Sequence, residues 1–150
     1  MKTLFDTKNE VGVRFRIKQL KPNTPARWGK TTAPRVLAHL VDVLEAPLDT
    51  SSAPGSALLK ISAMRWLHIR SMPCPDGKLL VSEEVTPAEL AAWNDTAQKW
   101  YDACSRFVAR FRTEPPVAFA PHPLYGPLPA DEWGRLVYYH IDHHLNQFGV

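Results

Sequence analysis

Hydrophobic residues recur along the chain at the spacing of amphipathic helices, in windows that prolines separate. The clearest window runs from Thr86 to about Arg112, and its opening Thr-Pro-Ala-Glu supplies an N-cap, a first-turn proline and a capping-box Glu89. At 100° per residue one stripe collects its large apolar side chains, namely Trp93, Ala97, Trp100, Cys104, Phe107, Val108 and Phe111. This pattern predicts the longest helix of the chain within residues 86–113.

Two further windows have the same periodicity. One extends from Thr32 or Ala33 to about Leu48 with Pro34 in its first turn, and the other from Ala130 to Phe148. Residues 58–69 have the pattern of a shorter amphipathic helix. Six of the fourteen prolines lie within residues 115–129, and because proline removes a backbone donor and blocks helix interiors, this stretch is predicted to be irregular.

Residues 1–21 carry a conflicting pattern. Val11, Val13, Phe15 and Ile17 alternate with polar residues or glycine, as they would in a strand. A lone strand without a partner is only marginally stable, and no other segment offers a clear partner. We therefore expect a helix here that tolerates Gly12.

Composition and charge restrict the class of protein. The 150 residues are 45% hydrophobic and 22% charged, which is typical of one soluble globular domain. No apolar run is long enough to span a membrane, and no secretory signal opens the chain, so a cytoplasmic location is expected. Residues 1–35 hold nine Lys and Arg against two acidic residues. Without interleaved aromatic residues or a known motif, this basic region does not indicate a nucleic-acid partner.

Histidines provide the candidate chemistry. His140 and His144 stand four residues apart inside the apolar arc of the last predicted helix, a spacing that lets two imidazoles meet one cation. His39 borders the apolar face of the helix over residues 33–48 and offers a third imidazole. Three such ligands leave a coordination position open, as in catalytic sites. The alternative is a set of hydrogen-bonded core histidines without metal.

Other polar groups near this pair receive different interpretations. His143 lies at the edge of the apolar arc and is expected outside the ligand set. Gln147 and His143 are each candidates either for a group that supports a metal ligand or for a group on the substrate side, with Gln147 near the open position. His122, between two prolines, is predicted to be an exposed loop residue, although its loop leads directly into the last helix and could reach the open site. Cys104 lies in an aromatic stripe, which favours an inert thiol.

The residues that carry a family resemblance are concentrated near the C-terminus. The run His122-Pro-Leu-Tyr-Gly-Pro-Leu, then Glu132-Trp-Gly-Arg-Leu and His140-Ile-Asp-His-His-Leu-Asn-Gln-Phe-Gly, resembles a branch of the DinB-like metal-binding superfamily. Arg27-Trp-Gly-Lys, Val36-Leu-Ala-His-Leu and Leu4-Phe-Asp extend the resemblance over nearly the whole chain. It implies an all-α, up-and-down four-helix bundle with a long, partly structured crossover between helices 2 and 3. It also implies that His39, His140 and His144 bind a divalent metal.

Two functions follow from these expectations. The first is a metal-dependent enzyme that acts on a small-molecule electrophile, with zinc or nickel as the favoured metal. The resemblance implies a transferase or isomerase that uses a low-molecular-weight thiol, and metal-assisted hydrolysis is a variant of this hypothesis. The second is a non-catalytic metal-binding bundle that serves as a structural or interaction module, with a homodimer as one form.

Overall fold

The computed structural model describes residues 1–49, 84–113, 118–122 and 125–150. These residues form four α-helices, α1 (Thr7–Gln19), α2 (Ala33–Glu45), α4 (Pro87–Phe111) and α5 (Ala130–Gln147), and the short 3-10 helix η1 (Ala46–Leu48). The described part contains no strand, only an isolated bridge between His122 and Gly126. The predicted all-helical class is therefore confirmed for these residues. The predicted helix over residues 58–69 lies outside them.

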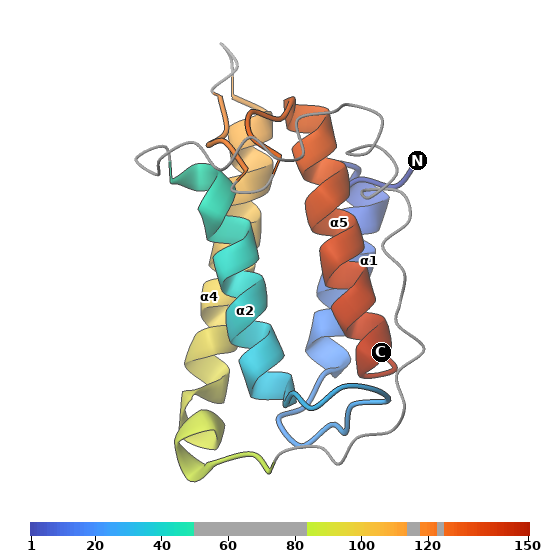
Figure 1. Ribbon diagram of the computed structural model, residues 1–150, viewed down its shortest axis with the longest axis vertical. Coiled ribbons are helices and arrows are strands. Elements are labelled where there is room, and N and C mark those ends of the chain that lie inside the picture. Colours follow the sequence, from blue (N-terminus) through green and yellow to red (C-terminus); the bar gives the residue numbers. More distant parts are fainter. Residues whose placement is uncertain (50–83, 114–117, 123–124) are drawn as a thin grey trace.

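The four α-helices lie along the long axis of the molecule, with α2 beside α4 and α1 beside α5 (Figure 1). Arg35 pairs with Glu89 at the beginnings of α2 and α4, and Glu45 pairs with Arg106 toward their ends. These two helices therefore point the same way, and α1 and α5 both point the opposite way (Figure 1). The expected crossover corresponds to residues 50–83, outside the described part.

The first helix resolves the conflict in the N-terminal pattern. Val13 and Ile17 are buried, whereas Val11 and Phe15 are 59% and 63% exposed. The apparent alternation thus arises from two apolar pairs, each four residues apart, on different faces of one helix. The helix starts at Thr7 rather than at the chain start, because the Asp6 side chain accepts a hydrogen bond from the Asn9 N–H and caps it.

The longest of the described helices is α4, as its pattern predicts. Thr86 and Glu89 form the predicted reciprocal capping box. Trp100, Cys104 and Phe107 are fully buried, and the exposed Phe111 at the end of the stripe stacks on Phe5 with ring centroids 3.9 Å apart. Burial raises the pKa of the Cys104 thiol to about 12, so this thiol is inert at neutral pH, as expected.

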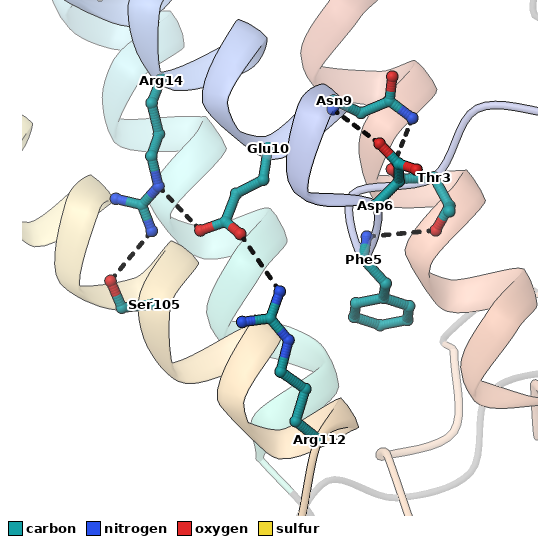
Figure 2. A network of polar contacts seen from close by, with 8 residues as sticks. All are labelled: Thr3, Phe5, Asp6, Asn9, Glu10, Arg14, Ser105 and Arg112. Carbon is teal, nitrogen blue, oxygen red and sulfur yellow. Dashed lines mark hydrogen bonds and ion pairs between the residues drawn. The ribbon is translucent and has the colours of Figure 1, made fainter.

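An ionic network connects the beginning of α1 to the end of α4 (Figure 2). The Glu10 carboxylate lies 3.0 Å from Arg14 and 3.7 Å from Arg112, and Arg14 also donates to the Ser105 hydroxyl. Pairs of this kind near solvent contribute little stability each. These contacts nevertheless place the beginning of α1 beside the end of α4 along the bundle axis.

Contacts with the N-terminal residues hold the last helix in place. The Leu4 N–H donates to the carbonyl of Gly134, 3.0 Å away. A Cβ on Gly134 would lie 2.4 Å from the ring of Phe5, so the absence of a side chain allows this close approach. Further along, Arg16 bonds Asp142 and Asn146 on the polar side of the helix. The opposite face of α5, with its histidines, is thereby turned toward α2.

The structure between Thr113 and Ala130 agrees with the predicted irregular stretch wherever it is described. No helix forms there, and the described residues are joined by the His122–Gly126 bridge and a bond from the Ala120 N–H to the Pro47 carbonyl. The Trp133 indole donates to the Ala120 carbonyl at 3.2 Å and ties this stretch to α5. Among the described helices, none has the length and apolar character that a bilayer crossing requires.

Candidate metal centre

The three predicted histidines meet between α2 and α5. His39, His140 and His144 each present a ring nitrogen, and these atoms all lie within 4.8 Å of one another. The Nε2 atoms of His39 and His140 are 2.8 Å apart. The ring centroids of the three pairs are separated by 5.0 to 5.2 Å. Packing of α2 against α5 thus brings together one imidazole from the second helix and two from the last, as the spacing and the resemblance predict.

Burial keeps the imidazoles of His140 and His144 neutral. Loss of solvent is the main reason that the pKa of His140 falls to about 3, and the neighbouring histidines lower it further. Burial also lowers the pKa of His144, although its hydrogen bond to Gln147 acts in the opposite direction. His39 is exposed and marks the solvent side of the cluster. Neutral imidazole is the form that binds a metal cation, so His140 and His144 have the protonation state that a metal site requires.

The donor set fits one divalent cation of the size of Zn²⁺. Nitrogen ligands about 2.0–2.1 Å from such a cation lie roughly 3.0–3.4 Å from one another, depending on the coordination angle. The nitrogens of this cluster are 2.8 Å apart in the closest pair and no more than 4.8 Å apart in the others. Three nitrogens at these separations could hold one such cation, and no fourth ligand joins them among the described residues.

Gln147 lies behind His144, which is one of the two places expected for it. The side chain is 6% exposed and engaged on both sides. Its Oε1 lies 2.9 Å from Nδ1 of His144, and its Nε2 donates to the carbonyl of Trp28 at 2.9 Å. Gln147 therefore supports a histidine of the cluster from behind.

His143 lies outside the cluster, in agreement with its position on the helix. No ring nitrogen of His143 is among the three that converge. Its ring makes edge contacts with Trp28 and His144, at centroid distances of 6.1 and 5.2 Å. The sequence interpretation of this residue as a neighbour of the site agrees with these contacts.

A mostly apolar pocket adjoins the cluster at His140. Its volume is about 270 Å³, and it lies between α2, α5 and the loop before α5. The walls are formed by apolar side chains together with His140, His122 and one charged group, Asp42; the apolar residues are Val43, Ala46, Trp133, Leu136 and Val137. The arrangement offers space for a small molecule immediately beside the candidate ligands.

His122 corrects one expectation. It was predicted to be an exposed loop residue, but its ring stacks on Tyr125 and lies 5.1 Å from the ring of Trp133. Burial lowers the pKa of His122 to about 4, so the ring is neutral at physiological pH. The loop thus contributes a neutral polar group to the wall of the pocket opposite α2.

Comparison with known proteins shows which family the chain matches. Residues 5–149 match the model of a family described as protein of unknown function, DUF1569. The chain belongs to the DUF1569 family. No curated protein and no solved structure matches it. The candidate metal centre of this DUF1569 protein therefore has to be interpreted from its own residues.

Sequence reasoning missed two participants of the DUF1569 site. Asp42 lies on the polar side of α2 by its helical position, yet it lines the pocket. The Trp28 carbonyl holds Gln147, and a backbone group leaves no mark in side-chain patterning. For Gln147, in contrast, the sequence did offer a signal. It follows His144 by three residues, a spacing that brings two side chains of a helix together.

Proposed function

We propose that this DUF1569 protein is a divalent-metal-dependent enzyme that acts on a small molecule bound beside His140. In this proposal His39, His140 and His144 hold the cation, and the protein is a distant member of the DinB-like superfamily, with the corresponding four-helix bundle. The observation that carries the proposal is the convergence of three imidazole nitrogens within 4.8 Å next to a 270 Å³ pocket. A purely structural site has no need of the pocket.

The chemistry follows from the donor set. A divalent cation held by these three imidazole nitrogens would keep its full charge and would lower the pKa of a thiol or water bound beside them. The chain's own groups then have separate tasks: the apolar walls exclude water, and His122 and Asp42 face a bound molecule from two sides. We favour transfer or isomerisation with a low-molecular-weight thiol on a small electrophile, and hydrolysis is the variant.

Metal analysis followed by a thiol-transfer screen tests the proposal. Protein purified without a histidine tag is expected to bind one equivalent of Zn²⁺ or Ni²⁺ and to consume electrophiles in the presence of a thiol. Replacement of His144 with alanine should abolish both properties, whereas the same change at His143 should affect neither. Full metal binding without turnover of any electrophile, or a fourth protein ligand that closes the site, would contradict the enzyme assignment.

The alternative is a non-catalytic module that acts through an interface, including a homodimer. One observation favours it: Val11 and Phe15 form an exposed apolar pair on α1, away from the cluster. Removal of the metal with a chelator distinguishes the two proposed functions. If the metal is structural, its removal should unfold the protein, whereas in an enzyme with an open site the apolar core should keep the fold and only the melting temperature should fall.

The pocket beside His140 predicts a preference for ligand charge. Asp42 is the one charged side chain among the described residues that line it. In metal-free protein we therefore expect benzylamine to bind about 2–5-fold more tightly than benzyl alcohol, and benzoate to bind more weakly than either, since an exposed carboxylate contributes up to roughly 1 kcal/mol. NMR titration, followed through the indole of Trp133, measures the three affinities.

Two variants give this experiment its controls. Asp42→Asn should bind benzylamine and benzyl alcohol equally. Glu45→Gln removes a carboxylate from the same helix that does not line the pocket, and it should retain the wild-type order. Tighter binding of benzoate than of benzylamine would refute the assignment of charge preference.

A further inference from the structure

The side-chain amide of Gln147 connects the candidate metal centre to a distant loop. Gln147 is the last residue of α5 and is nearly completely buried. Its Nε2 lies 2.9 Å from the backbone carbonyl of Trp28, and its Oε1 lies 2.9 Å from Nδ1 of His144. The loop residue and the glutamine are 119 positions apart in the chain. A contact so remote in sequence arises only from the folded arrangement.

The chemistry of these groups fixes the direction of each hydrogen bond. A carbonyl oxygen only accepts, so the NH₂ of the Gln147 amide must face Trp28. The amide oxygen is then left for His144, and because it also only accepts, the Nδ1 atom of His144 must carry the proton. A neutral imidazole has one ring proton. The Nε2 atom of His144 therefore has a free lone pair that is available to the cluster.

The tautomers of the other two histidines, His39 and His140, are not fixed in this way. Their Nε2 atoms lie 2.8 Å from each other, a distance at which one donates and the other accepts. Either assignment satisfies this pair, so the proton can sit on His39 or on His140. Of the three rings in the cluster, His144 is the one for which a described backbone carbonyl, acting through an amide, selects the tautomer.

Two features of the loop over residues 27–29 permit this contact. The Arg27 N–H donates to the backbone carbonyl of Gln147 at 2.7 Å, which holds the loop against the end of α5. Gly29 has φ +81°, and a Cβ at this position would lie 2.8 Å from Nε2 of Gln147. A larger residue there would be strained in its backbone and would push on the amide. The glycine thus permits the loop to approach the glutamine closely.

We propose that Gln147, oriented by the Trp28 carbonyl, is a positioning residue that holds His144 in the Nδ1–H tautomer and presents its Nε2 atom to the cation. The expected effect on metal affinity rests on the proposed metal site, whereas the tautomer of His144 is a property of the metal-free protein. Partners behind a metal ligand typically change metal affinity about 10–100-fold when they are removed. Residues 27–29 accordingly influence the cluster without contact with the cation.

Long-range ¹H–¹⁵N NMR of the histidine side chains tests the tautomer directly. In metal-free wild-type protein at neutral pH we expect His144 to show a protonated Nδ1 and an unprotonated Nε2. In Gln147→Leu the preference should disappear, with a mixture of both tautomers, and Zn²⁺ affinity measured by competition with a chelating dye should fall about 10–100-fold. Gly29→Ala, which keeps the amide but displaces it, should shift both readouts in the same direction by a smaller amount.

A matched control comes from the neighbouring residue. Asn146→Leu removes a side-chain amide from the same helix end, but that amide faces Arg16 and Asp142, so tautomer and affinity should stay at wild-type values. A wild-type His144 protonated at Nε2, or a Gln147→Leu protein with folded spectra and unchanged tautomer and affinity, would overturn the proposal. If no variant binds Zn²⁺ but the tautomer changes as expected, the positioning by Gln147 stands and the proposed enzymatic function fails.

Discussion

Replacement of His140 or His144 with alanine is expected to lower the affinity for Zn²⁺ or Ni²⁺ by at least about 100-fold, because each change removes one of three donors and exceeds the effect of losing a supporting group. His39→Ala should do the same. These nitrogens converge within 4.8 Å, so each is needed to surround a single cation. Isothermal titration calorimetry on metal-free protein measures the loss.

The fold should survive these substitutions. The hydrophobic core is made of aliphatic and aromatic side chains from all four α-helices and includes none of the three histidines. Far-ultraviolet circular dichroism should therefore keep most of its helical signal in each variant. His143→Ala is the matched control on the same helix, and it should retain both metal and helix. A His143 variant that loses the metal, or a His140 variant that keeps it, would show that the ligand set is assigned wrongly.

Metal-free protein is expected to lose stability steeply as the pH falls below about 6.5. Burial lowers the pKa of His140 to about 3 and that of His122 to about 4, whereas both side chains titrate near 6.5 in the unfolded chain. Between these values the unfolded state binds more protons, so protonation favours unfolding. The slope for His140 is on the order of 1 kcal/mol per pH unit. It should be largest between about pH 6 and pH 4.

Urea unfolding of chelator-treated protein across this range measures the slope. His140→Leu removes the titrating group and replaces it with an apolar side chain that suits the adjacent pocket, so the dependence on pH should become shallower. His143→Gln, outside the cluster, should leave the slope as in wild type. A free energy of unfolding that is flat from pH 7 to pH 4 in the wild-type protein would mean that His140 is well solvated.

The helices of this protein could be predicted from the sequence because their signals are local. The capping box of Thr86 and Glu89 and the stripe around Trp100 lie within a few turns of each other. The same holds for the pair His140 and His144, whose common face follows from a separation of four residues. The ambiguous N-terminal pattern shows the limit. The two faces of α1 could be told from a strand only once Val13 and Ile17 were seen in the core.

The sequence by itself determined α2, α4 and α5, the inert Cys104 and the two histidines that share one helix face. It also offered His39 as a third imidazole, and the family resemblance implied the same residue. Only the tertiary structure decided that α2 and α4 run in the same direction, that His122 lines a pocket, and that Gln147 bonds the carbonyl of Trp28. The physical reason is the range of the interactions. Helix periodicity and capping act over three or four residues, whereas the surroundings of a buried polar group are set by whichever distant segments pack against it.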